Sequence, residues 1–222
     1  MIIHLDAVTP QEEAIEKASA VLLDGGVVAC PTESFYGLAV DAGNETAIQK
    51  LFSLKERERR NPILLLIPSV ESLTECVASV PPPASRLIRE FWPGGLTLIF
   101  NASEKISPLL TGGAGKIGLR LSSHPVPTSL ARALQRPITG TSANPSGRPP
   151  CRRSEEVTAY FGDRIDLIID GGQTHGGLGS TVLDVTCDPP GVVREGMITR
   201  YRLEEFDAQR HMKHSPDRKA LP

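Results

Sequence analysis

Four cationic side chains lie close together in the stretch LKERERRNP, namely Lys55, Arg57, Arg59 and Arg60. Ammonium and guanidinium groups pair with anionic oxygens, so this cluster could hold the phosphates of a ligand. On a regular helix Lys55 and Arg57 would diverge by about 200°, so both reach one ligand only if the helix ends there. Pro62 favours such an end. The other interpretation is a solvated helix end whose charges Glu56 and Glu58 balance. The segment alone leaves both open.

Two later segments combine glycine with small polar residues. GTSANPSG follows an apolar strand and offers Ser142, Asn144 and backbone N–H groups to phosphate or ribose, although these residues are also ordinary in turns. DGGQTHGGLGST has five glycines that permit close approach to a ligand. It lacks the Gly-Lys-Ser/Thr ending of a P-loop, which argues against a Walker-type NTPase.

Arg120 interrupts the apolar strand segment IGLRL. Turned inward, its guanidinium would need an anionic partner such as a substrate carboxylate, whereas turned outward it would be a surface residue. The strand pattern favours neither. The histidines show no metal-ligand spacing except His211 and His214 near the end of the chain, so we predict no protein-held metal. PTESFYG is not a G-x-S-x-G elbow, which disfavours a serine hydrolase.

The whole-chain composition excludes some classes of partner. With 222 residues and a net charge of -2, the protein has no global field that would attract nucleic acid or membranes. Four separated cysteines form no CxxC pair and no disulfide framework. We find no signal-peptide pattern and no apolar run of about 18 residues. We therefore expect a cytoplasmic protein that does not span a membrane.

Alternating helix and strand patterns position these residues. We predict a first helix with Thr9 as N-cap, Pro10 at its first position and its end at Gly25-Gly26. Asn44 should cap a second helix that leads to the basic cluster. Strands are expected at 27–30, 38–42, 63–67, 96–100, 117–121, 138–142, 166–170, 180–186 and 191–195, and further helices at 69–77, 83–92, 126–135 and 154–162. This pattern predicts one α/β domain over residues 1–202, followed by a polar tail over 203–222.

The ordered set PTESFYGLAVDA, LKERERRNPILLL, FWPGGLTLIF, IGLRLSSHPV, GTSANPSG, GGLGSTVLDV and VVREG resembles the YrdC-like family across about residues 10 to 200. The resemblance implies an α/β fold with a twisted mixed sheet, flanked by helices and enclosing a concave basic cavity. It further implies a nucleotidyltransferase that condenses L-threonine, bicarbonate and ATP, with Mg²⁺, to threonylcarbamoyl-AMP and pyrophosphate. A downstream tRNA threonylcarbamoyl-transferase would then modify the adenosine beside the anticodon.

The same resemblance implies roles for particular residues. Lys55 and Arg57 would face the triphosphate as the catalytic cations. Ser142, Asn144 and Arg194 would complete the ATP site, and Thr32, Arg120 and Ser180 would hold threonine. Such roles predict that Lys55→Ala reduces activity with little loss of thermal stability.

Two departures from the family pattern affect this interpretation. Many relatives carry a lysine where this chain has Asn61, and Arg59 or Arg60 could replace it as an ATP contact. The second C-terminal domain of longer relatives is not expected here.

Other functions are compatible with the same sequence. They are an RNA-binding module, or weak tRNA or RNA binding beside the enzyme activity, and a paralogue of the same fold without the activity. The net charge and the 5% aromatic content argue against the RNA-binding module.

Overall fold

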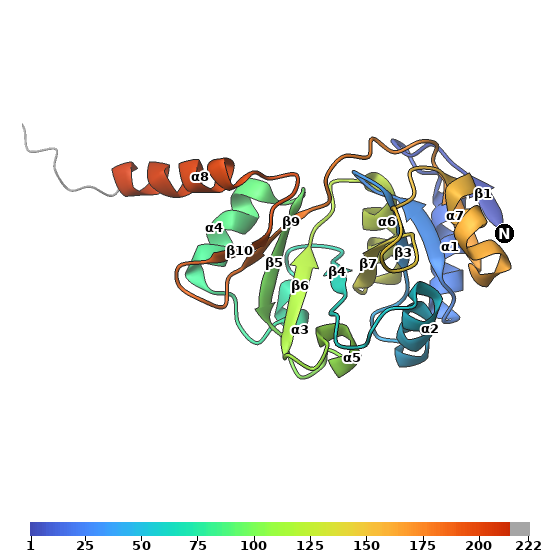
Figure 1. Ribbon diagram of the computed structural model, residues 1–222, viewed down its shortest axis with the longest axis horizontal. Helices are drawn as coiled ribbons and strands as arrows, with labels where there is room; N and C mark the ends of the chain where they lie inside the picture. Colours follow the sequence, from blue (N-terminus) through green and yellow to red (C-terminus); the bar gives the residue numbers. More distant parts are fainter. Residues whose placement is uncertain (214–222) are drawn as a thin grey trace, which may run out of the picture.

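The computed structural model describes residues 1–213, and the side chains of residues 1–206. Within these residues ten strands form one sheet in the order β1-β8-β2-β3-β7-β4-β6-β5-β9-β10 (Figure 1). Their bounds are β1 (Ile2–His4), β2 (Val28–Pro31), β3 (Tyr36–Ala39), β4 (Leu64–Leu66), β5 (Leu96–Asn101), β6 (Lys116–Arg120), β7 (Ile138–Ser142), β8 (Leu167–Asp170), β9 (Thr181–Asp184) and β10 (Gly191–Arg194).

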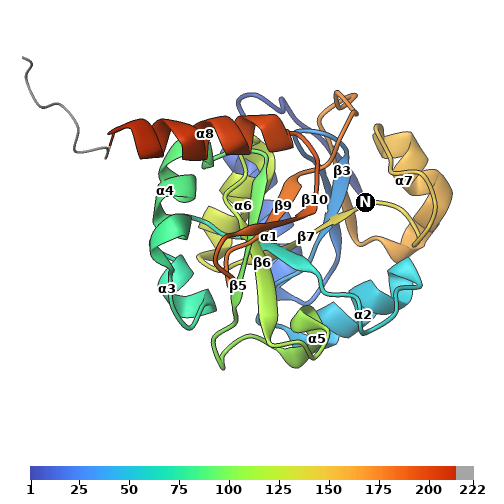
Figure 2. The ribbon, with the colours of Figure 1, turned by 60° about the vertical axis from the view of Figure 1, so that its left-hand side comes forward.

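The helices are α1 (Glu12–Leu23), α2 (Glu45–Lys55), α3 (Leu73–Cys76), α4 (Pro82–Phe91), α5 (Pro108–Thr111), α6 (Pro125–Leu134), α7 (Ser154–Phe161) and α8 (Arg200–Lys213), with a short 3-10 turn at Gly162–Arg164. Figure 2 shows α3 and α4 along one side of the sheet and α7 at the other, with α2 and α5 at one end.

The sheet is mixed, as predicted. β8 is parallel to both β1 and β2, β4 is parallel to β6 and β5 is parallel to β9, whereas β3 and β7 are joined to their neighbours by antiparallel pairing. At the centre of the sheet, strands from distant parts of the chain lie side by side. β7 pairs with β3 through Ser142 and Gly37 at one end and with β4 through Ile138 and Leu66 at the other, and Leu66 in turn is in register with Arg120 of β6.

Helices α1 and α6 pack against each other and against the β2 and β8 side of the sheet. Ile15, Ala18 and Leu22 of α1 form an apolar stripe and share a buried cluster with Leu130 and Leu134 of α6. Residues that recur at this spacing lie on one face of a helix, and burial of that face fixes both helices on the sheet.

The start of α1 differs from our prediction. Gln11, not Thr9, is the N-cap, and no side chain caps the helix. The hydroxyl of Thr9 instead donates to Asp6 at 2.9 Å, and Asp6 also accepts from the backbone N–H of Val8 at 2.8 Å. A local aspartate turn therefore takes the hydroxyl that would otherwise cap the helix.

The second helix begins at its predicted cap and ends within the basic cluster, which is the alternative that Pro62 favours. The side chain of Asn44 accepts from the N–H of Ala47 at 3.0 Å, as an N-cap does. At the other end Lys55 is the last helical residue, and Glu56 follows with a left-handed φ of 51°. The chain thus leaves the helix axis between Lys55 and Arg57.

Three elements were missed: β1, α5 and α8. The predicted boundary at residue 202 falls inside α8. Leu203 of this helix is buried and belongs to the main core. Phe206 packs edge-on against Phe91 of α4, with 5.4 Å between the ring centroids. Figure 1 shows α8 at the end of the molecule opposite the N-terminus. Residues 214–222 of the predicted tail, with His214, lie outside the described residues. Among the described helices, none is long and apolar enough to cross a membrane.

Candidate functional site

A cavity of about 770 Å³ opens over the centre of the sheet. This volume is in the range of pockets for small molecules and cofactors. Its lining combines residues from both halves of the chain and includes most of the predicted site residues: Thr32, Arg57, Arg120, Ser142, Asn144, Ser180 and Arg194. Lys55 and Arg59 are not in this lining.

The cavity is basic, as expected. Arg57, Arg120, Arg148 and Arg194 line it, and Glu195 is the one carboxylate among its described lining residues. Burial and the nearby charge of Arg120 both lower the pKa of Arg194, so those two guanidinium groups are close enough to repel each other. A surplus of cations in a concave site favours an anionic ligand.

Lys55 lies beneath the loop that follows β7, and its side chain is 2% exposed. Its ammonium donates to the carbonyl oxygens of Ser142 at 2.5 Å and Asn144 at 2.7 Å. Burial, and then the charge of Arg57, lowers the pKa of Lys55 to about 8. Lys55 therefore joins the end of α2 to this loop, and the predicted contact with a triphosphate stays a prediction.

The rest of the basic cluster separates into two groups. Arg57 is half-buried, lines the cavity and donates to the carbonyl oxygens of Asn61 at 3.2 Å and Pro62 at 2.9 Å. Arg60 forms an exposed ion pair with Glu58, and Arg59 is exposed. Of these arginines, only Arg57 is positioned toward the cavity in this structure.

Asn144 organises the loop after β7. Its side-chain nitrogen donates to the carbonyl oxygens of Pro145 at 2.9 Å and Arg148 at 2.7 Å, so its amide orientation is fixed. Its Oδ1 atom is buried and has no partner among the described residues. A buried acceptor of this kind can receive a hydrogen bond from a ligand. Ser142, paired with Gly37 across β3 and β7, lies beside it in the lining.

A chain of hydrogen bonds joins Thr97 on β5, Ser180 just before β9 and Arg194 at the end of β10. The Oγ of Ser180 accepts from the hydroxyl of Thr97 at 2.8 Å and from Nη2 of Arg194 at 3.3 Å. Arg194 also donates to the Ser180 carbonyl oxygen at 2.8 Å. With both acceptor positions of its hydroxyl used, Ser180 is left to donate its own proton to a ligand acceptor.

Arg120 points inward and its side chain is 8% exposed. The anionic partner that it finds within the protein is Glu33, whose Oε1 lies 2.9 Å from Nη1 of Arg120. Glu33 belongs to the same loop as Thr32, whose hydroxyl donates to the Phe35 carbonyl oxygen at 2.7 Å. The inward alternative for Arg120 is therefore confirmed, with a partner that we did not predict.

Sequence reasoning missed Glu33, Thr97 and Arg148. Glu33 is in the quoted segment PTESFYG, but its partner is 87 positions away and no local pattern links them. An inward arginine needs a buried anion, and that requirement is the one signal that could have led to Glu33.

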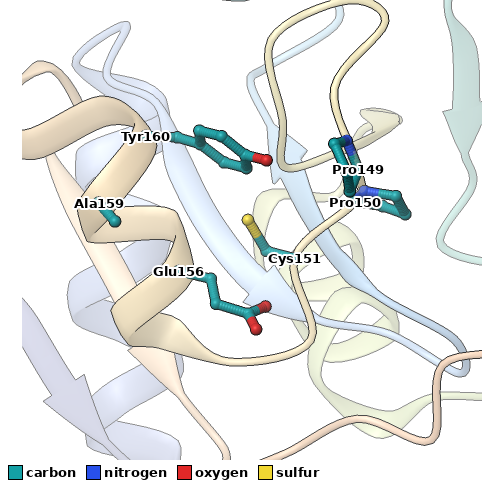
Figure 3. Close-up of a pocket in the computed structure, with 6 residues that line it drawn as sticks. All are labelled: Pro149, Pro150, Cys151, Glu156, Ala159 and Tyr160. Atoms are coloured by element: carbon teal, nitrogen blue, oxygen red, sulfur yellow. The ribbon is translucent and has the colours of Figure 1, made fainter.

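A second, smaller cavity of about 260 Å³ lies between α7 and the segment before it (Figure 3). The thiol of Cys151 points into it, and burial, with Glu156 nearby, raises the pKa of Cys151 to about 12. The Glu156 carboxylate accepts from the N–H groups of Arg152 and Arg153. The carboxylate of Glu156 thus caps α7, and the thiol of Cys151 is protonated. We therefore assign this pocket no chemistry.

The fit of a metal ion depends on the donors around the main cavity. No group of three or more histidine, cysteine or acidic side chains capable of holding a metal occurs in the described part of the chain. Glu195 is the one lining carboxylate found there. This donor set suits Mg²⁺ that arrives with a nucleotide, because Mg²⁺ is commonly held by substrate phosphates, water and one or two carboxylates.

The chain is similar to known proteins. The sequence model of the Sua5/YciO/YrdC family, described as telomere recombination, matches residues 20–196. A curated threonylcarbamoyl-AMP synthase of Pyrococcus abyssi is 36% identical over 195 residues, which are 88% of this chain and 57% of the relative. The Bacillus subtilis enzyme of the same name is 36% identical over 200 residues, which are 90% of this chain and 58% of that protein.

A solved structure is similar as well. The crystal structure of P. abyssi Sua5 complexed with L-threonine has a TM-score of 0.89 and 35% identity, and the match covers 93% of this chain and 60% of that one. The chain thus spans somewhat more than half the length of these relatives. The matched part contains the strands and loops that line the cavity.

Proposed function

Because the chain belongs to the Sua5/YciO/YrdC family, we propose that it synthesises threonylcarbamoyl-AMP from L-threonine, bicarbonate and ATP, with release of pyrophosphate. The observation that carries the proposal is the basic cavity, in which four of the six predicted nucleotide residues and all three predicted threonine residues lie in one lining. Curated relatives that match most of this chain are named threonylcarbamoyl-AMP synthases.

In this proposal the two ligands meet at Ser180. Arg194 on the nucleotide side donates to Ser180, and Arg120 on the threonine side is near enough to Arg194 to lower its pKa. Arg57 and Arg194 would stabilise the negative charge of the phosphates, and Arg120 would pair with the threonine carboxylate. Thr32 and Ser180 would offer hydroxyl groups to the polar atoms of threonine.

The reaction needs close placement more than a reactive side chain. The neutral amine of threonine forms an N–C bond with bicarbonate, and water leaves. An oxygen of the resulting carbamate then bonds to the α-phosphorus of ATP while the bond to pyrophosphate breaks. Holding the reactants in one cavity lowers the entropic part of the barrier. When bound, Mg²⁺ would neutralise phosphate charge, and Glu195 is the one carboxylate among the described lining residues that could help to hold it.

Lys55 takes a supporting role in this proposal. Its ammonium is committed to two carbonyl oxygens of the loop that carries Ser142 and Asn144. It would therefore position those residues for the nucleotide. The exposed Arg59 is a weaker candidate for an ATP contact than Arg57, because it does not line the cavity.

We further propose that the product passes to a tRNA threonylcarbamoyl-transferase and that the protein acts in the cytoplasm, where ATP and tRNA are available. The comparisons do not favour an RNA-binding module or a paralogue without the activity.

Pyrophosphate release tests the activity directly. The protein is incubated with ATP, bicarbonate and Mg²⁺, with or without L-threonine, and D-threonine serves as the stereochemical control. We expect release that depends on both L-threonine and bicarbonate. Release that is absent, or that is the same without threonine, would rule out this function.

A further inference from the structure

Glu33 connects the two parts of the cavity that carry the predicted threonine contacts. Its Oε1 pairs with Nη1 of Arg120 at 2.9 Å and accepts from the hydroxyl of Ser122 at 2.7 Å. The same oxygen accepts from the backbone N–H of Ser123 at 2.7 Å and, less closely, of His124 at 3.3 Å. One carboxylate therefore joins the loop of residues 32–35 to the end of β6 and the start of α6.

The ion pair is buried and incompletely satisfied. The side chains of Arg120 and Glu33 are 8% and 13% exposed. Nε of Arg120 is buried with no partner among the described residues. A buried guanidinium N–H without an acceptor is costly, and native sites usually satisfy such a donor with protein, water or ligand. This orphan donor belongs to a residue that lines the main cavity.

The geometry of a guanidinium defines what this donor can bind. Nη1 of Arg120 is engaged by Glu33 and, at 3.5 Å, by the carbonyl oxygen of Gly94. The Nε and Nη2 hydrogens point in parallel along the opposite edge of the group, and together they match the two oxygens of a carboxylate. The described structure gives that edge no protein acceptor.

We infer that Glu33 is a positioning residue that holds Nη1 of Arg120, so that the Nε–Nη2 edge is presented to the α-carboxylate of the amino-acid substrate. The inference rests on the proposed function and deepens it, because it assigns the selection for a carboxylate to a pair of residues. Glu33 remains ionised in this role: burial alone would raise its pKa, but Arg120 and Ser122 outweigh that effect and lower the pKa to about 2.

The experiment compares L-threonine with L-threoninol, which has a CH₂OH group in place of the carboxylate. Dissociation constants are measured by calorimetry in the presence of a non-hydrolysable ATP analogue, for the full chain and for Glu33→Gln. Wild type should prefer L-threonine strongly. Glu33→Gln should weaken L-threonine binding by roughly tenfold or more, which corresponds to loss of one charge-assisted contact, and should leave L-threoninol binding nearly unchanged.

Two further variants separate positioning from folding. Ser122→Ala removes one support of Glu33 and should reduce the same preference by a smaller factor. Glu156→Gln removes a carboxylate that also accepts backbone N–H groups, but away from the main cavity, and should keep the preference. In an Arg120→Ala background, Glu33→Gln should cause no further loss of L-threonine affinity.

Equal weakening of both ligands by Glu33→Gln would overturn the inference, because a purely structural role affects them alike. An unchanged preference in Glu33→Gln would overturn it as well. If wild type binds neither ligand, the proposed function itself fails. That result differs from the one in which only the inference fails. In that case wild type prefers L-threonine, but the preference does not depend on Glu33.

Discussion

Two buried cations near the cavity have different partners, and the partners define their roles. Lys55 has two backbone carbonyl oxygens as acceptors and does not line the cavity. Arg120 lines the cavity and forms an ion pair with the carboxylate of Glu33, and its buried Nε–H has no partner among the described residues. At the scale of the residue, therefore, we expect Lys55 to affect both stability and nucleotide binding, and Arg120 to affect threonine binding.

Replacement of Lys55 tests that distinction. Lys55→Met keeps the length of the side chain but, among the described residues, removes the donor of the Asn144 carbonyl oxygen and one of the two donors of the Ser142 carbonyl oxygen, which should cost roughly 2 kcal/mol of unfolding free energy. The KM for ATP should rise because the loop of Ser142 and Asn144 loses its support. Urea unfolding and ATP kinetics measure both effects. This expectation replaces the earlier one of unchanged thermal stability.

The matched control is Lys17→Met on the exposed surface of α1, where Lys17 pairs with Glu13. It should change the unfolding free energy by less than about 0.5 kcal/mol. If Lys55→Met were equally harmless to stability while activity was lost, Lys55 would contact the phosphates and would not support the loop.

Acid unfolding tests the Glu33 pair. The pKa of Glu33 is about 2 in the folded protein, below its usual value of 4.5. Between these values the unfolded chain binds the proton and the folded one does not, so acidification favours unfolding. We expect wild type to lose unfolding free energy from about pH 4.5 down to pH 2 more steeply than Glu33→Gln. Parallel pH profiles from urea unfolding would contradict this account of the pair.

At the scale of the element, strands with clear boundaries were predictable and short or partner-dependent elements were not. β7 begins and ends where the apolar pattern of ITGTS predicts. β1 has three residues and owes its conformation to pairing with β8, which sequence periodicity does not reveal. The helix α8 carries few apolar residues, so its segment was interpreted as a polar tail.

The packing of α8 on α4 gives a prediction at this scale. Leu203→Ala removes a buried side chain from the main core and should lower the unfolding free energy by about 2 to 4 kcal/mol. Tyr201→Ala, two residues earlier and 73% exposed, is the matched control and should have little effect. Thermal unfolding of the two variants compares them. Equal Tm values would mean that the start of α8 does not contribute to the core.

At the scale of the whole molecule, the sequence predicted which segments meet, and the structure adds how they are joined. The basic cavity and seven of its lining residues followed from the ordered motifs. The contacts of Glu33 with Arg120 and of Thr97 with Ser180 cross 87 and 83 positions, and they arise only when the sheet brings those strands together. Long-range polar pairing of this kind follows no local pattern in a single sequence.

The central claim is that this cavity joins threonine, bicarbonate and ATP into one product. Mass spectrometry of reactions with carbon-13 bicarbonate tests it most directly. We predict threonylcarbamoyl-AMP that carries the label, formed only when L-threonine and ATP are both present. Absence of any labelled adenylate in reactions of the folded protein would contradict the account.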